Sequence, residues 1–194
     1  IVMWPLFLIS IISLTCIFER IYFWWKLRNI NKKSLIYLID FYSNGMIEAT
    51  NKKRSNIPLE KVLIETNKIL KNSESEVNLA LKISIQSIQP EFDRFNNLFS
   101  TIITISPLIG LLGTVIGLIN SFSFLQLGNS GVNSEQVTGG ISEALISTAT
   151  GLIIAIFTLI FFNYFNSLRK KQNSILNEYC GRYELSICKK IKNI

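Results

Sequence analysis

Charged residues are missing from three long stretches of the sequence. Residues 1–18 contain none, residues 95–134 form a run of 40 uncharged positions, and residues 144–168 form another run of 25. A membrane with a hydrocarbon core of roughly 30 Å is crossed by about 20 apolar helical residues. The uncharged stretches therefore predict an all-α integral membrane protein with three transmembrane helices, at about residues 1–18, 99–125 and 139–165.

A secretory signal peptide is the alternative interpretation of residues 1–18. A signal peptide ends in small residues at its cleavage site. Residues 19–25 read ERIYFWW instead, and such charged and aromatic residues are typical of a membrane interface. We therefore expect residues 1–18 to be a span that is kept.

Histidine is absent and cysteine is scarce. Without histidine the chain cannot form a Ser-His-Asp or Cys-His catalytic pair, an HExxH zinc site or a haem-attachment motif. Cys16, Cys180 and Cys188 are odd in number and have no CxxC spacing, so they indicate neither a disulfide framework nor a metal site. We predict no enzyme activity, no metal and no cofactor.

Basic residues are missing from the short polar turn at residues 126–138. Of the 20 Lys and Arg residues, 13 lie between Arg20 and Arg94, and the other seven lie between Arg169 and Lys192. An excess of basic residues marks cytoplasmic segments of membrane proteins. We therefore expect a cytoplasmic loop at about 19–98, a cytoplasmic tail at about 166–194 and an outward N-terminus. Topology accounts for the basic residues, so no nucleic-acid partner is predicted.

The predicted cytoplasmic loop has apolar residues at helical spacing. Pro58, after Asn56, predicts the start of one helix, and residues 73–76 fit a capping box before a second. Pro90 either ends a helix or lies in the first turn of the next one. The pattern favours a bundle of amphipathic helices.

Small residues cluster in the second and third predicted spans. Gly110, Gly113 and Gly117 lie in the second span, and Gly151 lies in the third within a stripe of small residues. Spacings such as GxxxG allow the backbones of two helices to approach closely. These four glycines therefore predict close packing between the second and third spans.

Two threonines and one carboxylate lie within the same two spans. Thr114 and Thr148 are each about 14 to 16 Å from the outer end of their helix at about 1.5 Å per residue, so both lie near the middle of a roughly 30 Å core. Each hydroxyl either lines a polar path or bonds to a carbonyl of its own helix, four residues back. At helical spacing Ser147 and Thr150 share the face of Glu143, whereas Thr148 lies about 140° away.

Glu143 is the only residue of the predicted spans that is charged at neutral pH. A carboxylate at membrane depth is costly and is typically found in an internal cavity or a proton path. The alternative is that the positive end of the helix dipole and interfacial water stabilise it, because it lies near the start of its predicted span.

Three segments resemble the ExbB, TolQ and MotA family of bacterial proton-channel subunits. They are residues 3–22 (MWPLFLISIISLTCIFERIY), 106–122 (SPLIGLLGTVIGLINSF) and 141–165 (ISEALISTATGLIIAIFTLIFFNYF). The resemblance implies one channel domain over residues 1–194 in the bacterial inner membrane. It also implies a homopentamer of three-span subunits around two copies of a single-span partner of the ExbD or TolR kind.

The resemblance assigns pore-lining roles to Thr114, Thr148 and Glu143. It implies that proton flow drives a TonB- or TolA-like force transducer. Glu-Ala-Leu at 143–145 is similar to ExbB and TolQ rather than to MotA, so we expect a subunit that energises TonB-dependent transport. A TolQ-type role in envelope maintenance and a non-conducting scaffold are the alternatives. Phe157 replaces the family's usual proline, which predicts a straighter third helix.

Overall fold

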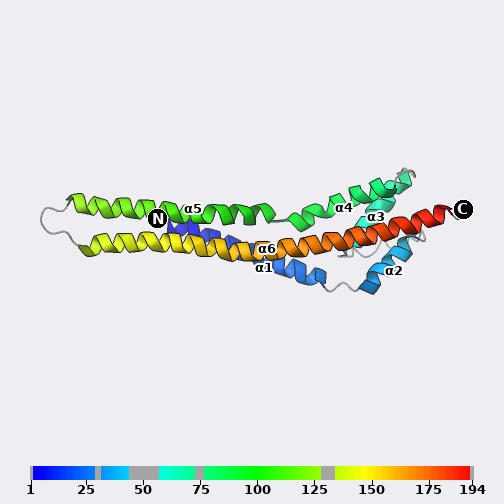
Figure 1. Cartoon of the computed structure of the whole chain (residues 1–194), viewed down its shortest axis with the longest axis horizontal. Helices are drawn as coiled ribbons and strands as arrows, with labels where there is room; N and C mark the ends of the chain where they lie inside the picture. Colours follow the sequence, from blue (N-terminus) through cyan, green and yellow to red (C-terminus); the bar gives the residue numbers. More distant parts are fainter. Residues whose placement is uncertain (1, 29–31, 44–56, 73–76, 128–133, 193–194) are drawn as a thin grey trace. The chain divides into compact units, whose positions relative to one another are not determined.

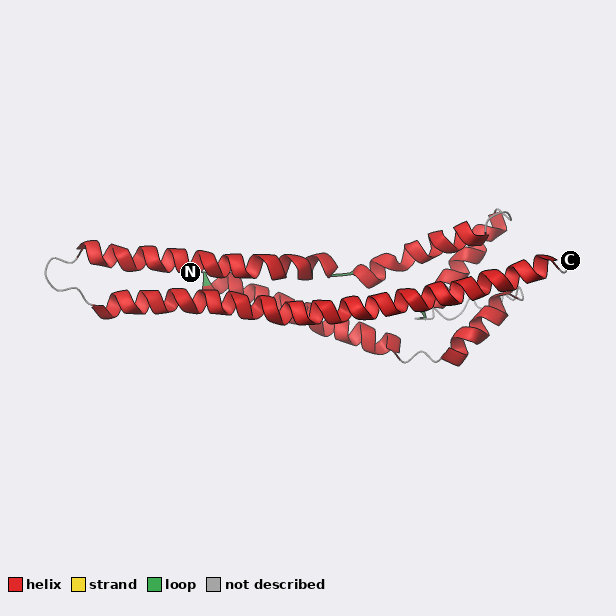
Figure 2. Ribbon diagram, in the orientation of Figure 1, coloured by secondary structure: helices red, strands yellow, loops and turns green. Residues whose placement is uncertain are grey.

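The computed structural model describes residues 2–28, 32–43, 57–72, 77–127 and 134–192, and these residues form helices without any strand. The helices are α1 (Met3–Arg28), α2 (Lys32–Ser43), α3 (Pro58–Asn72), α4 (Val77–Asp93), α5 (Asn96–Leu127) and α6 (Ser134–Lys192), as Figures 1 and 2 show. The prediction of an all-α chain is confirmed.

Three helices, α1, α5 and α6, are long and apolar enough to cross a membrane. Their large apolar side chains are mostly exposed, which suits contact with lipid rather than with water. The predicted number of transmembrane helices is therefore confirmed. The third of these helices begins at Ser134, before the expected start of its span at 139, and continues past 165 as a single helix to Lys192. It contains no proline that would break its backbone hydrogen bonds.

The chain divides into two compact units. The membrane unit comprises residues 1–21 and 95–165, and the second unit comprises residues 22–94 and 166–194. Both α1 and α6 contribute to each unit.

Packing of α3 on α4 organises the second unit. The buried side chains Val62, Leu63 and Leu81 form part of its core. The Tyr183 hydroxyl is also buried and donates a hydrogen bond of 2.8 Å to Oδ1 of Asn67, which ties the last part of α6 to α3. Burial of these apolar side chains contributes to the stability of this unit.

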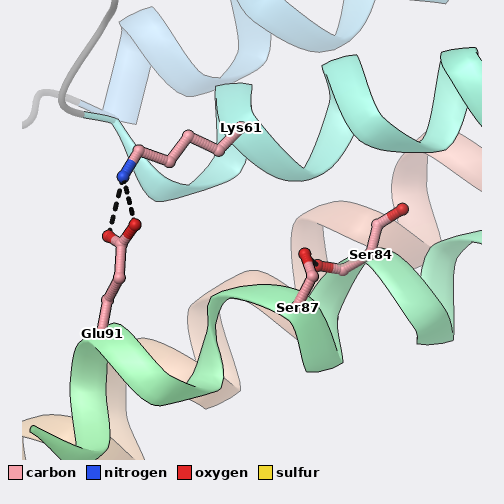
Figure 3. Close-up of polar contacts among 4 residues, drawn as sticks. All are labelled: Lys61, Ser84, Ser87 and Glu91. Atoms are coloured by element: carbon pink, nitrogen blue, oxygen red, sulfur yellow. Dashed lines mark hydrogen bonds and ion pairs between the residues drawn. The ribbon is translucent and has the colours of Figure 1, made fainter.

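One ion pair joins α3 and α4 at the surface. Lys61 Nζ lies 2.6 and 2.7 Å from the two carboxylate oxygens of Glu91 (Figure 3). Figure 3 also shows the Ser87 hydroxyl, which donates to the carbonyl of Ser84 within α4. Because both partners of the ion pair are exposed, it contributes only about 0–1 kcal/mol.

The observed ends of α3 and α4 can be compared with the predicted helix boundaries. Helix α3 begins at Pro58, as predicted. The predicted capping box at 73–76 lies outside the described residues. Pro90 lies in the last turn of α4, so it belongs to the end of one helix rather than to the start of the next. The break follows at Phe95, whose φ of 64° is left-handed and does not continue a helix.

Within the membrane unit, α5 and α6 lie side by side (Figure 1). They approach each other most closely at glycines. A Cβ atom added to Gly151 would lie 2.6 Å from the carbonyl oxygen of Ser106 and 3.1 Å from Cα of Gly110. A Cβ atom added to Gly110 would lie 2.9 Å from the carbonyl oxygen of Ser147. At these positions the two backbones touch, so no side chain fits between them.

The contact continues along both helices. A Cβ atom added to Gly113 would lie 2.7 Å from Cβ of Ser147, and one added to Gly117 would lie 2.7 Å from Cβ of Ala144. The four glycines that the sequence singles out therefore all lie where α5 meets α6.

A pair of buried hydroxyls joins α1 to α6. Ser13 Oγ and Thr158 Oγ1 are 2.8 Å apart, and their residues are 3% and 0% exposed. The single proton of the Thr158 hydroxyl is donated to the carbonyl of Ile154 at 2.8 Å. Ser13 is therefore the donor to Thr158, and the hydrogen bond satisfies a polar group that has no access to water.

We expect Ser13→Ala and Thr158→Val to be energetically coupled. Interhelical hydrogen bonds in membranes average about 0.6 kcal/mol and reach about 1.7 kcal/mol, so a double-mutant cycle should give a coupling in that range. The measurement is reversible unfolding in mixed micelles. Ser123→Ala is the control, because its hydroxyl is exposed and donates to Ile119 of its own helix. A coupling of zero between Ser13 and Thr158 would contradict the contact.

Gly151→Ala should destabilise the protein, whereas Gly139→Ala should not. The first adds a methyl group against backbone atoms of Ser106 and Gly110 in α5 and should cost roughly 1–3 kcal/mol, as overpacking does. The second meets nothing within 4 Å and replaces a poor helix former by a good one, so stability should stay equal or rise by up to about 1 kcal/mol. Equal unfolding free energies in the two variants would refute the backbone contact.

Candidate functional site

Glu143 lies on α6 with an exposed side chain and lines a cavity of about 520 Å³ in the membrane unit. Four further polar residues share the wall of this cavity: Asn120, Ser121, Ser123 and Ser147. The rest of the wall consists of Val2, Met3, Gly113, Ile116, Gly117, Gly139, Gly140 and Ala144. We call this space the Glu143 pocket. It is built by α5, by α6 and by the residues at the start of α1.

The glycine contact between α5 and α6 shapes this pocket. Gly113 and Gly117 are part of its wall and also face Ser147 and Ala144 across the helix interface. A longer side chain at either glycine would separate the helices or enter the pocket. The same small residues thus bring the helices together and leave room beside the carboxylate.

Ser147 lies one helical turn after Glu143 and is almost fully buried, at 4% exposed. Its hydroxyl donates to the Glu143 carbonyl at 3.2 Å and lies 3.9 Å from the sulfur of Met3. The hydroxyl of Thr150 lies 4.0 Å from the same sulfur and donates to the carbonyl of Ile146. The expected common face of Glu143, Ser147 and Thr150 therefore points toward the start of α1.

No basic side chain of α5, or of α6 as far as residue 168, can neutralise Glu143, because residues 95–168 contain no Lys or Arg. The start of α6 is about two and a half turns away, at 3.6 residues per turn. A helix dipole acts within the first turn, so it does not account for a carboxylate at this position. Hydroxyl and amide groups of the pocket, together with water or protons that enter it, are the groups suited to stabilise the carboxylate.

The two threonines are placed differently from Glu143. Thr148 Oγ1 donates to the carbonyl of Gly110 at 3.0 Å, so this hydroxyl bonds to the neighbouring helix. Thr114 Oγ1 donates to the carbonyl of Leu111 at 2.7 Å, within its own helix. Neither threonine is part of the wall of the Glu143 pocket. Within one subunit the structure therefore gathers Glu143 with Ser147 and leaves Thr114 and Thr148 outside that pocket.

Sequence reasoning singled out neither the residues Val2 and Met3 at the start of α1 nor the polar wall residues Asn120, Ser121 and Ser123. Asn120 follows Gly117 at a spacing of three residues, so helical periodicity places it near the face that meets α6. Val2 and Met3 are apolar residues in a predicted span and give no signal of their own. Among the described residues, no group of three or more His, Cys, Asp or Glu side chains could hold a metal ion.

Residues 51–178 match the sequence profile of the MotA/TolQ/ExbB proton channel family. The biopolymer transport protein ExbB-like 3 of Synechocystis is 40% identical over 184 residues, which cover 93% of this chain and 88% of that protein. ExbB-like 1 of the same organism is 35% identical over 89% of this chain and 69% of its own length. TolQ of Haemophilus influenzae is 34% identical over 57% of this chain and 45% of its own length. This multi-pass membrane protein therefore belongs to the MotA/TolQ/ExbB proton channel family.

Proposed function

We propose that this chain is the proton-channel subunit of an ExbB/ExbD-type complex that uses the proton gradient to energise TonB-dependent transport at the outer membrane. The observation that carries the proposal is the position of Glu143, a carboxylate within a membrane span that lines a cavity with four other polar residues. Such a group can take up a proton on one side of the membrane and release it on the other.

The proposed mechanism uses the change of charge on Glu143. As a carboxylate it requires hydration or polar partners, and as a neutral carboxylic acid it is much cheaper to keep in an apolar environment. Protonation and release would therefore alternate the membrane unit between two charge states. A single-span partner of the ExbD or TolR kind would supply the next proton-accepting carboxylate, because residues 95–168 hold only Glu135 and Glu143 as acids.

In this proposal Thr148 and Thr114 line the pore of a homopentamer. The hydroxyl of Thr148 donates its proton to Gly110, which leaves its oxygen lone pairs as acceptors for water or for a protonated group. Thr114 is in the same situation, because its proton goes to Leu111. Both residues would thus accept hydrogen bonds along the path, while the proton of Thr148 joins α6 to α5 and that of Thr114 stays within α5.

The energy available is sufficient for a conformational step. Moving one charge through 100 mV releases about 2.3 kcal/mol, so two protons supply about 4.6 kcal/mol. A shift of that size changes the ratio of two conformations by more than a thousandfold at about 1.4 kcal/mol per factor of ten. The energy of two protons is therefore sufficient to drive a conformational change that exerts force on a TonB-like transducer, without any bond chemistry.

An ExbB-type role is favoured over a TolQ-type role by the extent of similarity. The ExbB-like relative is aligned over 93% of this chain, whereas TolQ is aligned over 57%. The bacterial inner membrane, with the N-terminus outward and the C-terminus cytoplasmic, is the location that goes with this function and with the distribution of basic residues.

Glu143→Gln should abolish proton flux and leave the complex assembled. Glutamine keeps the size and hydrogen-bonding capacity of the side chain and removes the titratable group. The measurement is proton flux in vesicles that contain this chain and an ExbD-type partner, with complex size determined in parallel. Glu135→Gln is the matched control, because it removes a carboxylate from the same helix outside the predicted span. Normal flux in an intact Glu143→Gln complex would contradict the proposal and favour a scaffold.

A further inference from the structure

We propose that Met3 is a positioning residue that forms one wall of the Glu143 pocket and sets how readily water and hydrated protons reach Glu143. This inference rests on the proposed function, because access matters most if Glu143 exchanges protons. It assigns a role to a residue of α1, a helix that contributes none of the three predicted pathway residues.

Three contacts place the start of α1 against the pocket. The Met3 sulfur lies 3.9 Å from the Ser147 hydroxyl and 4.0 Å from the Thr150 hydroxyl. Val2 lies beside Gly113, where a Cβ atom added to the glycine would be 3.3 Å from a Val2 methyl group and 2.7 Å from Cβ of Ser147. The start of α1, the middle of α5 and the glutamate turn of α6 therefore converge at one point.

The methionine side chain is suited to a pocket wall whose opening changes. Its side chain is unbranched, flexible and polarisable, and its thioether accepts only weak hydrogen bonds. Met3 is 39% exposed, so its side chain is in contact with the pocket without being locked in a core. A change in its rotamer would alter the opening beside Ser147 without breaking a strong interaction.

Thr150 lies one turn beyond Ser147 on the same face of α6, and the Met3 sulfur touches both hydroxyls. The thioether thus covers two polar groups that would otherwise offer water a route along α6. The size of the residue at position 3, more than its sulfur, should determine whether that route is open.

Accessibility of position 143 tests this role without any measurement of proton flux. Glu143→Cys is made in full-length chains in which Cys16, Cys180 and Cys188 are replaced by alanine. The rate of reaction with 2-aminoethyl methanethiosulfonate, a small water-soluble cation, is measured in membrane vesicles. The reagent reacts with a hydrated thiolate, so the rate reports access from water.

Adding Met3→Ala should raise that rate several-fold, because the shorter side chain no longer covers Ser147 and Thr150. Adding Met3→Leu should leave the rate nearly unchanged, since leucine restores the bulk without the sulfur. Trp4→Ala is the control, because Trp4 is the next residue along α1, is 74% exposed and is not part of the pocket wall. It should not change the rate.

Equal rates in the Met3→Ala, Met3→Leu and unmodified backgrounds, in chains with native helix content, would overturn the role of Met3. So would an equal rise in Trp4→Ala, which would show a general loosening of α1. The proposed function fails by a different result, namely proton flux in Glu143→Gln. The two hypotheses can therefore be rejected separately.

Discussion

Backbone contact between α5 and α6 is the constraint on which the rest of the membrane unit depends. In lipid there is no hydrophobic force to bring two apolar helices together, so close packing and interhelical hydrogen bonds must do so. Gly110 and Gly151 bring the backbones into contact, and the Thr148 hydroxyl bonds to Gly110 at the same place. This junction sets which residues of the two helices face each other farther along, such as Gly113 with Ser147 and Gly117 with Ala144.

The Glu143 pocket is a consequence of the same junction. Going along α6 from Gly151 toward its start, the residues that face α5 include Thr148, Ser147, Ala144 and Gly140. Glu143, next to Ala144, is thereby directed beside the interface rather than into it. The start of α1 then closes one side, through Val2 and Met3. A carboxylate is tolerated here because the neighbouring small residues leave a pocket with polar residues in its wall. A tightly packed interface of aliphatic side chains would leave the carboxylate without polar partners.

The amino-acid sequence predicted the parts of this arrangement that depend on periodicity and charge. The number of spans followed from uncharged runs, and the packing glycines followed from the GxxxG spacing of Gly113 and Gly117 and from the stripe of small residues that contains Gly151. The partner of the Thr148 hydroxyl did not follow, because a threonine can bond within its own helix or to a neighbour, and only the distance between α5 and α6 decides. The position of Met3 in the pocket wall could not be predicted either. An apolar residue in a span looks like any other until the contact between α1 and α6 is known.

The direct test of the central claim, that Glu143 exchanges protons with water from within the membrane, is infrared spectroscopy of the complex in a lipid film. The spectrum is recorded as the pH of the bathing solution is changed, and the difference between the parent protein and Glu143→Gln isolates this carboxyl group. A carboxylic-acid carbonyl band that appears on acidification, and that is missing from the Glu143→Gln variant, is the result expected. Identical titration spectra for the two proteins would contradict the claim.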